Sequence, residues 1–202
     1  MPPARTSSRG FSLVEIVILL AVLSILASAV LPAFFRSTAR LRLSLAAREV
    51  AGVLRVARLY AVRHNAKVAV KFTTESNGRV TFSIFRDGDG DGVRNRDIDA
   101  GTDLRLTAPR RLAHLGSAIR FGFPVGAAPR DPSTGRPMTR LEDPIRFNRS
   151  DLASFSPMGA ATPGSVYLSD QRSNLVVVRV TSRTGRVRVL RYDYETEVWS
   201  PM

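Results

Sequence analysis

The chain of 202 residues contains no cysteine, so disulfides and thiolate metal sites are excluded. Its only histidines, His64 and His114, are not spaced as metal ligands. The sequence also has neither a Gly-x-Ser-x-Gly nucleophile elbow nor a phosphate-binding glycine loop. These absences predict a protein that is not an enzyme and that needs no cofactor, with the candidate calcium site below as the one exception.

Acidic residues are scarce as well, with 17 Asp and Glu against 30 Lys and Arg and a net charge of +13. The positive charge is almost entirely arginine, since only Lys67 and Lys71 are lysines. Such a balance favours anionic partners such as nucleic acid, acidic lipid or an acidic protein surface. An arginine-rich surface that reflects a high-GC genome is the alternative explanation.

Charged residues are absent from positions 16–35, where only Ser24, Ser28 and Pro32 interrupt the apolar character. A transmembrane helix needs about 20 apolar residues, whereas a secretory signal has a shorter apolar core. We therefore predict a membrane-spanning helix over residues 11–35, preceded by a basic leader over residues 1–10. Glu15 stands at the start of this helix, where a carboxylate either reaches the head-group region or has a partner.

Apolar residues recur at spacings of three and four beyond the apolar run, which predicts an amphipathic continuation of the helix over residues 36–65. After residue 65 the pattern alternates, and Asn77-Gly78 marks a hairpin. Strands are expected at 67–73, 79–85, 104–107, 118–123, 145–147, 165–169, 175–181 and 186–192. The predicted fold class is α+β, with a long N-terminal helix packed on an antiparallel β-sandwich-like domain over residues 66–202. Proline, glycine and arginine dominate residues 124–144, so we expect a mobile surface loop there.

Three aspartates at alternate positions, Asp87, Asp89 and Asp91, resemble the start of a calcium loop. Val93 would add a backbone carbonyl and Asn95 a further ligand. The usual bidentate glutamate is missing, and a plain Asp/Gly turn is the alternative.

A second candidate site is formed by Arg186 and Arg188, which flank Val187 in the sequence Gly-Arg-Val-Arg. On a strand these two side chains would share a face about 6–7 Å apart, a spacing that suits contacts with nucleic-acid phosphates. A solvated, charged edge strand is the alternative.

The N-terminal run GFSLVE at residues 10–15, with its basic leader and apolar continuation, resembles the prepilin processing motif of type IV pilins and type II secretion pseudopilins. The resemblance implies cleavage after Gly10 by a prepilin peptidase and N-methylation of Phe11. It also implies that Glu15 neutralises the N-terminal ammonium of a neighbouring subunit during filament assembly.

The C-terminal half resembles the GspH/FimT family of minor pseudopilins, through FSPMG at 155–159, PGSVYL at 163–168 and TGRVR at 184–188. This implies a structural and interaction subunit of a type II secretion pseudopilus or a type IV pilus, acting in protein secretion or pilus assembly. The expected partners are other pilins, the inner membrane and secreted protein cargo, with a single membrane pass and the C-terminal domain in the periplasm. Positive-inside counting favours the opposite orientation, because four arginines follow the span and two precede it.

Two other functions stay open at this point. In the FimT branch, pilins that bind DNA for natural transformation carry a Gly-Arg-x-Arg motif, which makes DNA a candidate partner of Arg186 and Arg188. A single-pass membrane-anchored enzyme or sensor would lack cleavage after Gly10.

Overall fold

The computed structural model describes residues 12–112, 118–126, 128–181 and 184–202. The chain divides into two compact units, residues 1–39 and residues 40–202. The helices are α1 (Leu13–Arg63) and α2 (Asn95–Ala100). The strands are β1 (Val68–Thr74), β2 (Val80–Arg86), β3 (Leu104–Arg105), β4 (Arg120–Phe121), β5 (Ile145–Arg146), β6 (Leu152–Phe155), β7 (Gly164–Ser169), β8 (Leu175–Val180), β9 (Val187–Asp193) and β10 (Val198–Pro201).

In the first unit the chain is the N-terminal part of α1, a continuous helix from Leu13. Its large apolar side chains are exposed within this unit, from Leu13 at 78% to Phe35 at 62%. Within the described residues, no helix has an apolar segment long enough to cross a membrane.

In the second unit α1 is amphipathic, as its sequence predicts. Alanine and aliphatic side chains at helical spacing are fully buried on one face, including Ala46, Val50, Leu54 and Ala61. The helix ends where Asn65 adopts a left-handed φ of 47°, a conformation that asparagine tolerates well and that commonly closes helices.

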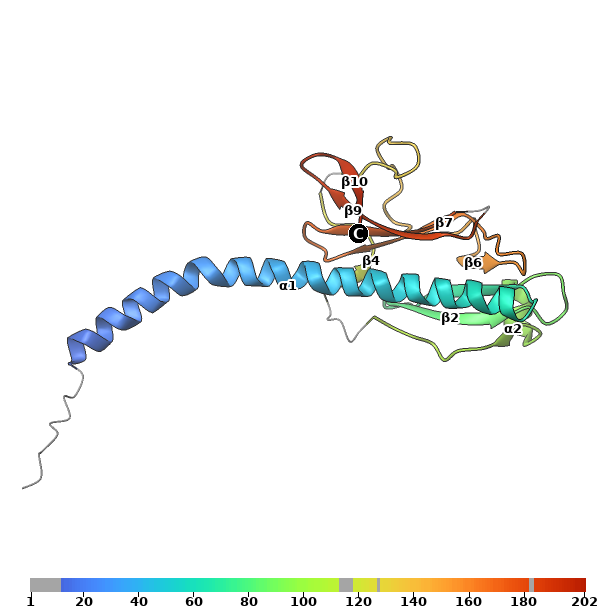
Figure 1. Cartoon of the computed structure of the whole chain (residues 1–202), viewed down its shortest axis with the longest axis horizontal. Coiled ribbons are helices and arrows are strands. Elements are labelled where there is room, and N and C mark those ends of the chain that lie inside the picture. Colours follow the sequence, from blue (N-terminus) through green and yellow to red (C-terminus); the bar gives the residue numbers. More distant parts are fainter. Residues whose placement is uncertain (1–11, 113–117, 127, 182–183) are drawn as a thin grey trace, which may run out of the picture. The chain divides into compact units, whose positions relative to one another are not determined.

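Two antiparallel sheets accompany this half of α1 (Figure 1). The smaller sheet has the strand order β3-β2-β1-β6, and the larger has the order β10-β9-β8-β7-β4, with β5 also paired to β7. All pairings are antiparallel, from Val68↔Arg86 in the first sheet to Val180↔Val187 in the second. The α+β class with an antiparallel β domain is therefore confirmed.

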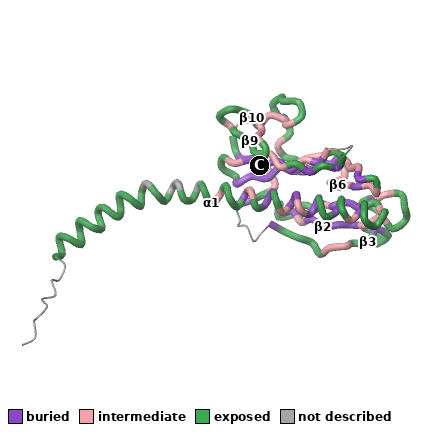
Figure 2. The backbone as a smooth tube through the Cα atoms, in the orientation of Figure 1, coloured by how far each residue is buried: buried purple, intermediate pink, exposed green. Residues whose placement is uncertain are grey.

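The principal core lies where α1 meets both sheets, and Figure 2 shows the buried residues gathered there. Phe72 of β1 joins the sheets, because its ring stacks on Phe147 at 6.0 Å and meets Phe121 of β4 edge-on at 6.2 Å. A second core covers the other face of the larger sheet and includes Tyr167, Tyr192 and the only tryptophan, Trp199.

Each of the eight expected strands overlaps a strand of the structure, although β3, β4 and β5 are only two residues long. Two strands were missed. β6 has no β-branched residue, and β10 ends in Pro201, which is tolerated because β10 is an edge strand. The short helix α2 was also missed, because its sequence NRDIDA has too few residues to show a helical period.

Candidate functional site

Glu15 lies in the first turn of α1, and its side chain is exposed. The amide of Ile16 donates to the carbonyl of Ser12, so the helical hydrogen bonding starts immediately before it. A helix N-terminus favours a negative charge, because its unpaired amides point outward there. Gly10 and Phe11, the predicted cleavage and methylation residues, lie outside the described residues.

The polar side chains within the apolar part of α1 are satisfied by the helix itself. Ser24 Oγ donates to the carbonyl of Ala21 at 2.8 Å, and Ser28 Oγ donates to that of Ile25 at 2.7 Å. Neither hydroxyl therefore needs water, and the surrounding surface is otherwise aliphatic and aromatic. A helical surface of this kind is stabilised when lipid or another apolar helix covers it.

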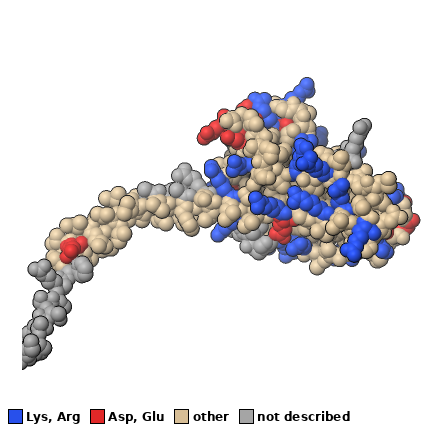
Figure 3. All heavy atoms as spheres, viewed as in Figure 1, with Lys and Arg blue, Asp and Glu red and all other residues tan. Residues whose placement is uncertain are grey.

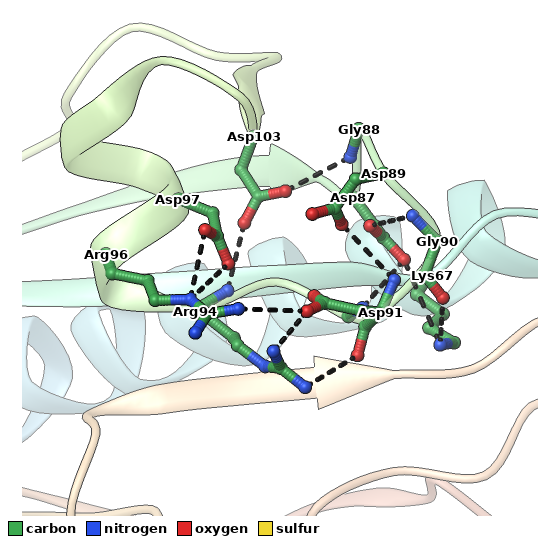
Figure 4. A network of polar contacts seen from close by, with 11 residues as sticks. Lys67, Asp87, Gly88, Asp89, Gly90, Asp91, Arg94, Arg96, Asp97 and Asp103 are labelled. Carbon is green, nitrogen blue, oxygen red and sulfur yellow. Dashed lines mark hydrogen bonds and ion pairs between the residues drawn. The ribbon is translucent and has the colours of Figure 1, made fainter.

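The predicted calcium loop between β2 and α2 is held by its own hydrogen bonds (Figure 4). The Asp87 carboxylate accepts the amides of Gly90 at 2.8 Å and Gly92 at 2.9 Å. Lys67 Nζ lies 4.0 Å from the same carboxylate and donates to the carbonyl of Gly90 at 2.6 Å. Aspartate, amide and ammonium groups thus close this turn.

Two arginines neutralise Asp91, the last of the three aspartates. Asp91 forms ion pairs with Arg94 and, at 3.2 Å, with Arg96. The buried Asp103 joins the two ends of the loop, because its carboxylate accepts the amides of Gly88 at 3.1 Å and Arg94 at 2.9 Å. Sequence reasoning missed Asp103, since it lies 12 residues beyond the last of the three aspartates.

The structure brings three of the five predicted calcium ligands together, and calcium binding by this loop stays a prediction. The carboxylates of the three aspartates do converge, with oxygens within 4.8 Å of one another. Asn95, however, donates its side-chain amide to the carbonyl of Ser150 at 3.3 Å. The Val93 side chain is buried in a small core, whereas the ligand predicted at this position is the backbone carbonyl. Ile98, at the position of the missing glutamate, packs against that core within α2. The geometry fits the alternative of an Asp/Gly turn.

The two arginines of the Gly-Arg-Val-Arg stretch lie in different surroundings. Val187 is buried as the first residue of β9, so the strand starts after Arg186 rather than before it. Arg188 lies directly opposite Arg179 in the β8–β9 ladder. Two like charges at that position are destabilising unless one is engaged elsewhere. Arg179 is engaged, because it donates to the carbonyl of Pro132 at 2.9 Å and to Ser133 Oγ at 2.7 Å.

Arg186 instead lines a cleft of about 680 Å³ between α1 and the turn before β9, together with Arg55 and Arg58 of the helix. Two glycines hold Arg58 in place. Its Nε donates to the carbonyl of Gly159 at 3.4 Å, and a Cβ atom on Gly185, whose φ is +55°, would lie 2.9 Å from that Nε. These glycines belong to the FSPMG and TGRVR motifs, so the motifs meet in space at this arginine.

The irregular loop 124–144, expected to be mobile, is attached to the larger sheet at several points. Arg130 accepts the indole N–H of Trp199 on its carbonyl at 2.7 Å, donates its amide to the Tyr192 hydroxyl at 3.2 Å, and pairs with Glu197. Met138 is buried in the second core. The loop therefore covers the outer face of β8, β9 and β10.

The β7–β8 turn is organised by Asp170, whose side chain is buried. One carboxylate oxygen accepts the amides of Arg172, Ser173 and Asn174, at 3.0, 3.1 and 3.0 Å. Burial alone would raise the pKa of Asp170, but the hydrogen bonds from Asn174, Arg172 and Ser173 outweigh it and hold the pKa below its ordinary value of 3.8. Asn174 also accepts a hydrogen bond from Arg40, which ties this turn to α1.

We expect Asp170→Asn to lower the free energy of unfolding at neutral pH by about 1–3 kcal/mol, because buried donors lose a charged acceptor. Since folding lowers the pKa, the carboxylate stabilises the fold above pH 3.8, and that contribution is lost as the pH falls through the lower pKa of the folded state. The difference between wild type and variant should therefore shrink at the acidic end. Urea unfolding of the full chain in detergent, followed by Trp199 fluorescence, measures it.

The exposed Asp99→Asn of α2 is the matched control, and it should change stability by less than about 0.5 kcal/mol. An equal loss in both variants would contradict the role assigned to Asp170.

Comparison with known families adds two matches. The family model for type II transport protein GspH matches residues 46–185, and the model for the prokaryotic N-terminal methylation motif matches residues 5–31. No curated protein and no solved structure matches the chain.

Proposed function

Because the chain belongs to the GspH family and is a minor pseudopilin of a type II secretion system or type IV pilus, we propose that its N-terminal helix is both membrane anchor and filament stem. The leader of residues 1–10 is removed after Gly10, and Phe11 becomes the N-methylated amino terminus. The helix then crosses the inner membrane once over residues 11–35 and leaves the β domain in the periplasm. As a pseudopilin the chain interacts with other pilins and with the prepilin peptidase.

The proposal rests on the exposed apolar surface of the helix that follows Glu15. The hydroxyls of Ser24 and Ser28 in this stretch donate to carbonyls of the same helix. Support for the anchor comes from the sequence of residues 11–35, in which Phe11 and the side chains of Ala29, Pro32 and Ala33 lie outside the described residues. In the membrane, lipid covers this surface; in the filament, the same surface packs on neighbouring stems. One apolar face thus serves both states.

Glu15 gives the assembly its specificity in this proposal. An ammonium and a carboxylate about 4 Å apart attract each other by about 4 kcal/mol at an effective dielectric constant of 20. Either charge alone in an apolar environment is costly. Pairing Glu15 with a neighbour's N-terminal amine therefore favours one stagger between adjacent stems.

The two family matches do not favour the alternative functions. They give no support to DNA or secreted cargo as a partner, and GspH is a structural pseudopilin family that is not known for enzymatic activity. What the domain contributes in this proposal is a surface for neighbouring subunits.

Intact-mass measurement of the chain from its host membranes tests the proposal. We expect the loss of residues 1–10 and one added methyl group on Phe11. Gly10→Val, which places a branched side chain beside the cleaved bond, should retain the leader. A wild-type chain that keeps its leader, or is cleaved beyond residue 35, would rule the proposed function out.

A further inference from the structure

The cleft between α1 and the turn before β9 concentrates positive charge. Arg55, Arg58 and Arg186 line one space of about 680 Å³, and no acid is among the described residues that line it. Figure 3 shows basic side chains spread over the visible face of residues 40–202, so charge by itself does not single out this cleft. What distinguishes it is that three arginines from two distant segments surround a single space.

Arg58 is held in a fixed position by the turns that carry Gly159 and Gly185. Its Nε donates to the carbonyl of Gly159, and a Cβ atom on Gly185 would lie 2.9 Å from that Nε and 3.0 Å from Cδ. Among the described residues this bond uses Nε alone, so the Nη groups stay available for a ligand. An arginine fixed in advance loses less conformational freedom when it binds.

The three arginines of the cleft keep their charge for a partner. None of them forms an ion pair within the described part of the chain, although Arg111 pairs with Glu75 and Arg130 pairs with Glu197. Planar guanidinium groups suit paired hydrogen bonds with carboxylates. The cleft therefore favours an acidic ligand.

Large apolar side chains are exposed beside these charges. Leu59 and Val62 of α1 line the same space and are 65% and 49% exposed. Met158, 92% exposed, directly precedes Gly159, where an added Cβ would lie 3.8 Å from Val62 Cγ2. Apolar side chains that gather on a surface commonly mark an interaction site. A complementary ligand therefore carries aliphatic side chains as well as carboxylates.

This lining fits a polypeptide better than a nucleic acid. Nucleic-acid bases are commonly held by aromatic side chains, and no aromatic residue is among the described residues that line the cleft. Phosphates would pair with the arginines but would leave Leu59, Val62 and Val187 without apolar contacts. An acidic segment with aliphatic side chains satisfies both parts of the lining.

We propose that the Arg55–Arg58–Arg186 cleft binds an acidic segment of a different protein, in which carboxylates stand beside aliphatic side chains. The partner is a different protein because two copies of a chain with a net charge of +13 repel each other. The proposal rests on the proposed function in one respect: it takes the partner to be another subunit of the same filament. The contact is separate from the packing of the stems, since the cleft lies wholly within residues 40–202.

Fluorescence anisotropy of labelled peptides tests this binding chemistry. The experiment uses the full chain purified in detergent from its host membranes, at physiological ionic strength. The probe is a fluorescein-labelled peptide that repeats the unit Glu-Glu-Leu, and a peptide that repeats Glu-Glu-Ser is its apolar control. We expect the leucine peptide to bind at least about fivefold more tightly than the serine peptide, because only leucine covers the aliphatic lining.

Removal of the three charges tests the role of the arginines. Arg55→Gln, Arg58→Gln and Arg186→Gln together should weaken binding of the leucine peptide by at least about tenfold, because charge-assisted hydrogen bonds are lost. The matched control makes the same change at three exposed arginines outside the cleft, Arg120, Arg136 and Arg149. It removes the same net charge and should change the affinity by less than about twofold.

Gly185→Ala tests the fixed position of Arg58 without removing any charge. The added methyl group displaces Arg58, so binding should weaken by at least about fivefold. Gly135→Ala is the matched control, because Gly135 also has a positive φ, of 69°, but an added Cβ there meets nothing within 4 Å. It should leave the affinity unchanged. Trp199 fluorescence checks that each variant is folded.

Several results would overturn the proposal. They are an absence of binding, equal affinities for the two peptides, and equal losses in the two arginine triples. Duplex DNA that binds more tightly than the leucine peptide, with the same loss in the cleft triple, would also overturn it, because the cleft would then hold nucleic acid.

The mass of the same preparation separates this proposal from the proposed function. Removal of residues 1–10 without peptide binding overturns the cleft proposal and leaves the proposed function standing. Peptide binding by a chain that keeps its leader supports the cleft and overturns the function. A chain that neither binds the peptide nor loses its leader overturns both.

Discussion

Glu15→Val is expected to leave the chain in the membrane fraction but to lower its incorporation into filaments by at least about tenfold, equivalent to 1.4 kcal/mol. The substitution makes the apolar helix more apolar, so membrane insertion is not impaired. What is lost is the partner of the neighbour's N-terminal ammonium. Removing one member of a buried ion pair costs about 3–5 kcal/mol, because the other charge stays uncompensated.

The amount of the chain that co-purifies with other pilins in sheared filaments, relative to the amount in membranes, measures this effect. Glu15→Asp is the matched control: it keeps the charge on a shorter side chain and should retain most of the incorporation. Leader cleavage should be the same in both variants. Undiminished incorporation of the valine variant would show that the Glu15 carboxylate only reaches the head-group region.

Gly164→Ala is expected to lower the free energy of unfolding by about 3 kcal/mol, at the upper end of the range for overpacking. Gly164 starts β7, and an added Cβ would lie 2.2 Å from Phe147 Cδ1 and 2.5 Å from the carbonyl oxygen of Arg146. Phe147 is fully buried, and its ring stacks on Phe72, so it has no free space to move into. The new methyl group must therefore push strands apart.

Gly52→Ala is the matched control, because the same substitution in α1 meets nothing within 4 Å. It should raise the free energy of unfolding by about 1 kcal/mol, since alanine is the better helix former. Urea unfolding in detergent gives both values, and opposite signs are expected. If Gly164→Ala left the free energy of unfolding unchanged, that result would contradict the close approach of β7 to Phe147.

Periodicity alone predicted most of the fold. The apolar run, the amphipathic half of α1 and the alternating strands each follow from the spacing of side chains within a short segment. The C-terminal motifs also indicated the correct family, because short runs such as PGSVYL carry local backbone requirements of the kind seen at Gly164. Where the local pattern was weak, as in β6 and α2, the prediction failed.

The predicted calcium and DNA sites stay predictions, because they depend on more than local spacing. Alternating aspartates resembled a calcium loop, but sequence spacing says nothing about where Asn95 turns or which cations surround Asp91. Likewise, a strand pattern predicted that Arg186 and Arg188 share a face, and it could not show that Arg186 also lines a cleft with α1. Both outcomes depend on contacts with distant segments.

By itself the sequence determined the processing motif, the apolar stem with Glu15 and the α+β class, because each depends on residues that are close together in the chain. Only the tertiary structure decided which arginines are bound by distant segments and which line the cleft. Arg58 meets Gly159 across 101 positions of chain, and Arg179 reaches Pro132 across 47. Such pairs form when packing of the core brings distant segments together, so no local pattern reveals that Arg179 is already engaged while Arg55, Arg58 and Arg186 surround an open cleft.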